Sequence, residues 1–368
     1  MDKACAKRLG IYHLIRRAIV LFNLGGPDSP KAIQPFLNNL FSDPAIIGLP
    51  SLFRLPLAKF ISKRRTGIAQ EIYTHLGGKS PLLDRTLEQA SALETVLRKE
   101  YPGDDVSVYV CMRYWHPMTP EVMADVISFD PDQILLLPLY PQFSTATTQS
   151  SLLDWIKTAK RKCLKIPTYS ICCYATLEKL AVAQADILNR VLDGVSDKGK
   201  TRVLFSAHGL PKKIIKRGDP YQWQVEQSAQ LIAEAAGLSD AKWCICYQSR
   251  VGPLKWIEPS LEQELKRAAK DGAAVVVLPV AFVSEHSETL VELDIEYKDV
   301  AERLGVTEYH RVPAVGTHPI FIEGLKEIAV SAFEQQVELR SFKELRCCPS
   351  KYDKCPSRLS GHYKREFL

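Results

Sequence analysis

Runs of consecutive apolar residues, rich in valine, isoleucine and leucine, alternate with helical patterns along most of this chain. Seven runs have the length of a strand, three before residue 160 and four after it: residues 18–25, 106–114, 133–141, 167–174, 201–209, 242–249 and 273–282. Strands that are apolar throughout are typical of parallel sheets covered by helices on both faces. The pattern predicts an α/β protein of two tandem units, each a parallel β-sheet flanked by helices, joined near residues 160–167.

Helical patterns fill the intervals between these strands, at residues 81–100, 120–127, 177–192, 221–236 and 261–271. The length of 368 residues suits two domains. We expect an N-terminal extension over residues 1–17, a first domain over 18–163 and a second domain over 164–318. A helix over residues 319–340 is expected to pack back on the first domain, and a cysteine-containing tail follows over residues 341–368.

Composition and charge exclude several classes of protein. The longest apolar run, residues 273–283, has about half of the roughly 20 residues that a membrane-spanning helix needs, which excludes a transmembrane protein. The first 17 residues are basic but lack the apolar centre of a secretory signal. We therefore expect a cytoplasmic protein, with organellar import as the less favoured alternative. The formal charge of +6 is spread along the chain, which argues against nucleic-acid binding.

Polar and aromatic residues gather where the apolar strands end, at residues 23–27, 113–116, 206–209, 248–250 and 284–288. In parallel sheets, ligands bind beyond the carboxyl ends of the strands, so we expect one cleft between the two units. Gly25 and Gly26 do not continue as G-x-G-x-x-G, because Pro27 and Asp28 follow, and no Walker motif is present. No nucleotide cofactor is expected.

Four titratable residues in or just after these segments suit proton transfer. His208 follows an apolar strand, where an imidazole can exchange protons near neutral pH; a purely structural histidine is the equal alternative. Glu288, Glu292 and Glu296 recur every four residues, which places three carboxylates along one helix face. Such a row predicts a relay for protons or a path for a divalent cation, with a solvated acidic face as the alternative.

Cysteines cluster in the tail, where Cys347, Cys348 and Cys355 fall within nine of the 368 residues. The paired spacings of a zinc finger are missing, so a fourth ligand would come from elsewhere. The candidates are Cys163 and the adjacent pair Cys172 and Cys173. Gathered thiolates suit an iron–sulfur cluster or zinc, and a tail with incidental thiols is the alternative.

Residues 49–61, LPSLFRLPLAKFI, combine leucine, phenylalanine and proline with single cations, and Lys63, Arg64 and Arg65 follow. An exposed apolar patch edged by basic residues suits the surface of an anionic bilayer. Burial as an ordinary connection between helices is the alternative.

Ten segments between about residue 18 and residue 334 occur in a fixed order: LFNLGGP (21–27), FLNNLFSDP (36–44), KRRT (63–66), GGKSPL (77–82), MRYWHP (112–117), PLYPQFSTATTQSS (138–151), FSAHGLP (205–211), GDPY (218–221), YQSRVGPLKW (247–256) and FVSEHSETLVELDIEY (282–297). In these segments the chain resembles the ferrochelatase family, whose members insert ferrous iron into protoporphyrin IX. The resemblance implies two Rossmann-like domains that hold the macrocycle between them.

Carried onto this sequence, the resemblance implies that His208 is the active-site histidine and Glu288 its partner across the pocket, both being candidate ligands of the incoming iron. Glu292 and Glu296 match the acidic row that leads away from the porphyrin. The residues implied to bind the porphyrin are Arg65, Ser80, Arg113, Tyr114, Trp256 and Phe282. Residues 49–61 match an apolar lip, which implies peripheral contact with the inner membrane.

The cysteine-rich tail matches only some members of the family, which carry a [2Fe–2S] cluster on such a tail plus one internal cysteine. Thr145 stands where certain of these members have the internal cysteine. The ligand candidates in this chain are therefore Cys172, Cys173, Cys347, Cys348 and Cys355.

The expected activity is that of a ferrochelatase, a lyase that forms protohaem in the last step of haem biosynthesis. Its substrates would be protoporphyrin IX and Fe²⁺, and a homodimer is compatible with the resemblance. Two alternatives stay open: a chelatase for coproporphyrin III, and a porphyrin- or haem-binding protein without turnover.

Overall fold

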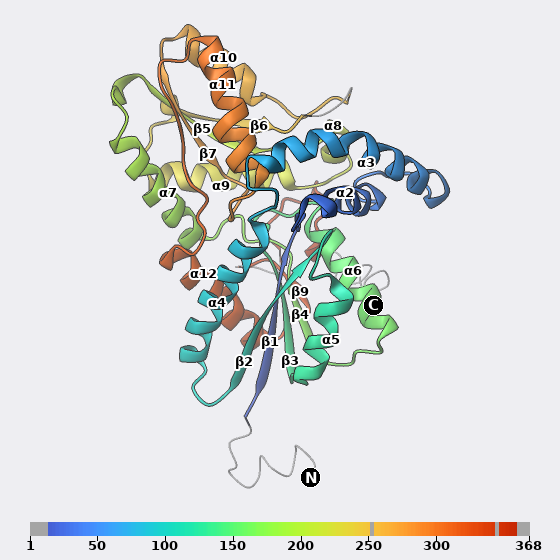
Figure 1. Cartoon of the computed structure of the whole chain (residues 1–368). Coiled ribbons are helices and arrows are strands. Elements are labelled where there is room, and N and C mark those ends of the chain that lie inside the picture. Colours follow the sequence, from blue (N-terminus) through green and yellow to red (C-terminus); the bar gives the residue numbers. More distant parts are fainter. Residues whose placement is uncertain (1–13, 251–253, 343–345, 359–368) are drawn as a thin grey trace, which may run out of the picture.

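The computed structural model of the chain describes residues 14–250, 254–342 and 346–358, which form two parallel β-sheets flanked by helices (Figure 1). This arrangement confirms the predicted fold class. The first sheet has the strand order β2 (Asp105–Met112), β1 (Arg16–Asn23), β3 (Gln133–Pro138), β4 (Thr168–Ile171) and β9 (Leu339–Arg340). The second sheet has the order β6 (Trp243–Gln248), β5 (Thr201–His208), β7 (Ala274–Pro279) and β8 (Tyr309–Arg311).

Both faces of each sheet are buried, which explains why the strands are apolar throughout. In β1, Ile19 and Leu21 belong to one core cluster, whereas Val20 and Phe22 belong to the cluster on the opposite face. Successive side chains of a strand point to opposite faces. In a strand covered on both faces, every side chain is therefore buried, which favours apolar residues at every position.

Helices connect the strands and cover the sheets. They are α2 (Ile33–Ser42), α3 (Ser51–Thr74), α4 (Leu82–Glu100), α5 (Thr119–Phe129), α6 (Thr148–Arg161), α7 (Glu178–Asp193), α8 (Lys212–Lys216), α9 (Tyr221–Ala235), α10 (Leu261–Lys270), α11 (Tyr297–Leu304) and α12 (Pro319–Gln335). A π-helix, η4 (Glu288–Glu296), precedes α11. Each helix expected between strands is present, with its ends within a few residues of the expected positions.

One predicted strand lies in the other sheet. The apolar run at residues 167–174 was expected to open the second unit, but β4 pairs in parallel with β3 of the first sheet. Leu339 and Arg340, expected at the end of the helix over residues 319–340, instead form β9 beside β4, because α12 ends at Gln335. The division between the sheets therefore follows β4 rather than residue 163, because α6 returns the chain to the open edge of β3 and α7 then crosses to the second sheet.

Helix α12 carries the end of the chain back from the second sheet to the first. It packs against α4 and α7, and its buried residues join the same core cluster as the inner strands of the first sheet. Within the described ranges, none of the helices combines the length and the apolar character needed to cross a membrane.

Candidate active site

One cleft is lined by residues from both halves of the chain. The first half contributes Leu24, Gly25, Phe36, Leu37, Leu40, Phe41, Arg65, Ile68, Ala69, Ile72, Tyr73, Ser80 and Leu82. The second half contributes His208, Ser249, His286, Ser287, Glu288, Val291, Glu292 and Glu296. The walls from α2 and α3 are mostly apolar, whereas the end of β5, the loop before the π-helix and the π-helix itself supply the histidines and glutamates. The cleft can therefore enclose an apolar ligand and place ionisable groups against it.

His208 is the last residue of β5, so its side chain emerges at the carboxyl end of the second sheet. Its Nδ1 lies 2.6 Å from the carbonyl oxygen of Gly209. A carbonyl can only accept, so Nδ1–H donates this hydrogen bond and fixes the orientation of the ring. The other ring nitrogen, Nε2, lies 3.8 Å from Oε1 of Glu288 and is the one that can take up a proton.

Glu288 opens the π-helix between two imidazoles. Its Oε1 faces His208, and its Oε2 lies 3.8 Å from Nε2 of His286. Burial disfavours the charged carboxylate, but the neighbouring histidines outweigh this effect and lower the pKa of Glu288 below its usual range. Its Oε2 is buried and accepts no hydrogen bond from the described residues. An anionic oxygen without a donor in this position suits a cation.

His286 is a site residue that sequence reasoning missed. It is buried, its Nδ1–H donates to the carbonyl oxygen of Ser284 (3.1 Å), and its ring packs edge-to-face on Phe282 at 4.6 Å. Burial alone would lower its pKa, yet the carboxylate of Glu288 raises the pKa of His286 overall. The sequence signal for it was its place in the strand-end segment 284–288, two residues before Glu288.

The π-helix aims the acidic row at the cleft, and Glu288, Glu292 and Glu296 all line it. The spacing predicted an α-helix, but Tyr297 N–H donates to the carbonyl oxygen of Glu292, five residues earlier, as π-helical winding requires. Such segments are rare and concentrate at functional sites.

Glu292 is held by residues at the end of β6. It accepts hydrogen bonds from the Ser249 backbone N–H (2.8 Å), the Ser249 hydroxyl (2.6 Å) and the side-chain amide of Gln248 (3.1 Å). Burial, followed by the charge of Glu288, nevertheless raises the pKa of Glu292. Glu288 and Glu292, neighbours in the acidic row, therefore differ in pKa: Glu288 is held charged, whereas Glu292 is more readily protonated.

The predicted porphyrin contacts divide into three groups. Arg65 and Ser80 line the cleft. Phe282 contacts His286, and Trp256 lies against Gly209, the residue after His208. The structure does not bring the remaining pair to the cleft. Arg113 and Tyr114 both bind the carboxylate of Asp43, at 2.8 and 2.9 Å, in a buried network that the sequence pattern did not reveal.

Tyr73 is a second residue that sequence reasoning missed. This residue of α3 lines the cleft, and burial raises its pKa to about 12 although Ser287 hydrogen-bonds to it. Close packing nearby depends on Gly26, since a Cβ atom there would lie 2.5 Å from Oγ of Ser80. The Gly25-Gly26 pair therefore fits a close approach between two cleft segments, as well as a tight turn.

Sulfur atoms from the tail meet sulfur atoms at the end of β4. Cys173 Sγ lies 3.5 Å from Cys347 Sγ and 3.7 Å from Cys172 Sγ, while Cys347 and Cys348 are 3.8 Å apart. Cys355 is buried and interacts with Cys348. Across residues 14–250, 254–342 and 346–358, no group of three or more His, Cys, Asp or Glu side chains meets the geometry of a metal site.

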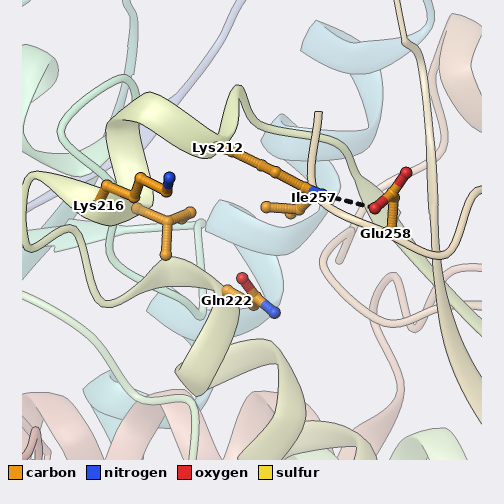
Figure 2. A pocket seen from close by; sticks show the side chains of 6 residues that line it. Lys212, Lys216, Gln222, Ile257 and Glu258 are labelled. Carbon is orange, nitrogen blue, oxygen red and sulfur yellow. Dashed lines mark hydrogen bonds and ion pairs between the residues drawn. The ribbon is translucent and has the colours of Figure 1, made fainter. Parts of the chain in front are cut away.

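A separate hollow on the second half contains none of the predicted site residues (Figure 2). It lies beside α8, and the ion pair between Lys212 and Glu258 closes one side of it. Its other lining residues are Ile215, Lys216, Gln222 and Ile257.

Comparison with known proteins identifies close relatives. The sequence model of the ferrochelatase family matches residues 16–332. A ferrochelatase of Pelagibacter ubique is 46% identical over 93% of this chain and 98% of its own length. The ferrochelatase of Wolbachia pipientis wMel is 50% identical over 86% of this chain and 99% of its own length. That of Caulobacter vibrioides NA1000 is 49% identical over 93% of this chain and 97% of its own length. Among solved structures, SirB from Bacillus subtilis with Fe³⁺ aligns with a TM-score of 0.51 at 12% identity, covering 88% of this chain and all of SirB, a likeness of fold.

Proposed function

The chain belongs to the ferrochelatase family, and we propose that His208 and Glu288 carry out its reaction, the insertion of ferrous iron into protoporphyrin IX to form protohaem. The observation that carries this assignment is the facing pair itself. Nε2 of His208 lies 3.8 Å from Oε1 of the partly buried Glu288 inside a cleft with apolar walls.

The reaction releases two protons, because Fe²⁺ replaces two pyrrole N–H hydrogens of the porphyrin. His208 Nε2 accepts a pyrrole proton, since its Nδ1–H is already committed to Gly209. Glu288 stays ionised and attracts the cation, in keeping with its lowered pKa. Glu292, whose pKa is raised, takes this proton from His208 and passes it along the row to Glu296, which leaves His208 Nε2 free to accept the second pyrrole proton.

Binding of the macrocycle is assigned to the apolar walls. Residues of α2 and α3 enclose a flat apolar ligand, and Arg65 supplies a cation for a propionate group. A planar porphyrin cannot accept a metal while both inner hydrogens lie in its plane, so a pocket that holds the ring bent favours the transition state over the substrate.

A metal-insertion assay tests this function directly. The purified protein is mixed with Fe²⁺ or Zn²⁺ and either protoporphyrin IX or coproporphyrin III, and the absorbance of the metalloporphyrin is followed. Faster insertion into protoporphyrin supports the proposal. Preference for coproporphyrin III, or porphyrin binding without insertion, would support one of the two alternatives instead.

For the tail, we propose that Cys173, Cys347, Cys348 and Cys355 hold a [2Fe–2S] cluster. The close approaches among their sulfurs support this set, and four thiolates are the usual ligands of such a cluster. Thr145, which stands where some family members have a cysteine, is engaged in other contacts: its backbone N–H and its hydroxyl both donate to Asp219, at 2.7 and 2.8 Å. A cluster bound here would lie beside α9, and the insertion chemistry above does not pass through it.

Gln224 supports the same site from α9. It is fully buried, its amide N–H donates to Cys348 Sγ at 3.0 Å, and its carbonyl oxygen accepts from the backbone N–H of Phe143 at 2.7 Å. Hydrogen bonds to ligand sulfurs orient them and tune the reduction potential of a cluster.

For the membrane, we propose that helix α3 rests on the inner membrane from the cytoplasmic side. Leu52, Phe53 and Phe60 are 77, 64 and 58% exposed, an unusual density of large apolar side chains at one helix end. Arg54 and Lys59 lie among them and suit anionic headgroups. A homodimer stays an expectation, which sedimentation of the purified protein would test.

A further inference from the structure

Arg311 of the edge strand β8 ties the π-helix to the loop before it. Its guanidinium donates to both carboxylate oxygens of Asp294, at 2.7 and 2.6 Å, and to Oε1 of Glu285 at 2.6 Å. Asp294 lies within the π-helix and Glu285 precedes it, so one side chain fixes two points of the segment. The Arg311 side chain is only 9% exposed, and two-pronged contacts of this kind are geometrically demanding.

Tyr309, two residues earlier on the same strand, replaces a hydrogen bond that an α-helix would make. In α-helical winding the N–H of Tyr297 would donate to the carbonyl oxygen of Leu293, four residues earlier. Here that N–H donates to Glu292 instead, and the hydroxyl of Tyr309 donates to Leu293 O at 2.8 Å. Tyr309 thus donates, from outside the helix, to a carbonyl that the N–H of Tyr297 does not bond in the wider winding.

We propose that Tyr309 and Arg311, the β8 clamp, are positioning residues that keep residues 288–296 in π-helical winding and so set the spacing of the three glutamates. Neither residue lines the cleft. A return to α-helical winding would rotate Glu292 and Glu296 around the helix axis relative to Glu288. The catalytic consequence rests on the proposed function, whereas the structural one does not.

Two conservative variants test the clamp. Tyr309→Phe removes only the hydroxyl, and Arg311→Lys keeps the charge but loses the two-pronged contact. We expect hydrogen–deuterium exchange of the peptide over residues 288–297 to quicken by about ten-fold, and kcat for metal insertion to fall by about ten-fold, with KM for porphyrin unchanged.

Arg17→Lys is the matched control, because Arg17 of β1 makes a largely buried ion pair with Asp104, which precedes β2 of the first sheet. It should lower thermal stability without changing exchange at residues 288–297. Exchange within about two-fold of wild type in both clamp variants would overturn the proposal, and so would faster exchange with unchanged kcat. A wild-type protein that forms no metalloporphyrin contradicts the proposed function instead, while the exchange measurement still decides whether β8 sets the winding.

Discussion

The carboxylate of Glu292 accepts two hydrogen bonds from Ser249, one from its backbone N–H at 2.8 Å and one from its hydroxyl at 2.6 Å. Ser249 adopts a left-handed backbone conformation, with φ of +61°, that suits glycine better than serine. A strained residue at the end of β6 therefore stabilises the charged form of a carboxylate whose burial opposes it.

The first prediction concerns this contact. Ser249→Ala removes one hydrogen bond to the carboxylate, so the pKa of Glu292 should rise further and the group should lose its proton only at higher pH. If Glu292 accepts protons during metal insertion, the acid limb of the pH profile of kcat moves upward. On the acid side we expect a loss of about five-fold, with little change at alkaline pH.

The control is Ser260→Ala, which removes the N-terminal cap of α10 and should leave the pH profile of kcat unchanged.

Glu292→Gln tests the raised pKa of Glu292 through the thermal stability of the protein. Because the folded-state pKa of Glu292 is raised, its ionisation costs stability as pH rises through that pKa. The glutamine variant should therefore gain thermal stability at neutral pH relative to acid pH, and an equal effect at both would contradict the assignment.

Gly26→Ala tests the close packing beside the cleft. The added Cβ would meet Ser80 at 2.5 Å, so Ser80 must move, with a loss of about 1–3 kcal/mol in the free energy of unfolding and a higher KM for porphyrin. Ser80→Gly in the same chain should recover most of the stability. A double variant no more stable than Gly26→Ala would show that the two residues are not coupled.

The proposed cluster ligands include Cys173 but not the adjacent Cys172, so the two cysteines should respond differently to substitution. Cys173→Ser should give a protein without the visible absorbance of an iron–sulfur cluster, whereas Cys172→Ser should keep it. Cys173 lies 3.5 Å from the tail thiol of Cys347, and for Cys172 the shortest recorded approach is the 3.7 Å to Cys173 itself. A colourless, iron-free wild-type protein prepared without oxygen would refute the cluster, and loss of colour in Cys172→Ser alone would refute this ligand set.

The apolar end of α3 is tested by partition onto liposomes that contain anionic lipid. Leu52→Ser together with Phe53→Ser should weaken the partition by at least about ten-fold, since both side chains are largely exposed and available to lipid. Leu87→Ser changes a half-exposed leucine of α4 and serves as the control. Equal partition of all three proteins would leave α3 without a role at the membrane.

The sequence predicts what depends on local pattern. Apolar runs locate β1, β3, β5 and β7, and the rule that ligands bind at carboxyl strand ends brings His208 and Glu288 into one cleft. Local pattern does not reveal which sheet a strand joins, so β4 was assigned to the wrong unit.

Other features depend on contacts between distant segments. The four-residue spacing of the glutamates fits an α-helix as well as the observed π-helix, whose winding is supported by Gln248 and Tyr309 from neighbouring strands. Arg113 and Tyr114 directly follow the end of β2, but both bind the buried carboxylate of Asp43 and neither is among the residues that line the cleft. The sequence alone therefore cannot tell whether a titratable residue faces the site or binds a residue that is distant in the sequence.

The most direct measurement compares porphyrin binding with metal insertion in His208→Ala and Glu288→Gln. Each change removes one side of the facing pair while leaving the apolar walls intact. We predict that both variants bind protoporphyrin IX within about three-fold of the wild-type Kd and insert Fe²⁺ or Zn²⁺ at least about 100-fold more slowly. Insertion at the wild-type rate in either variant, with porphyrin bound, would contradict the assignment of proton transfer and metal delivery to these two residues.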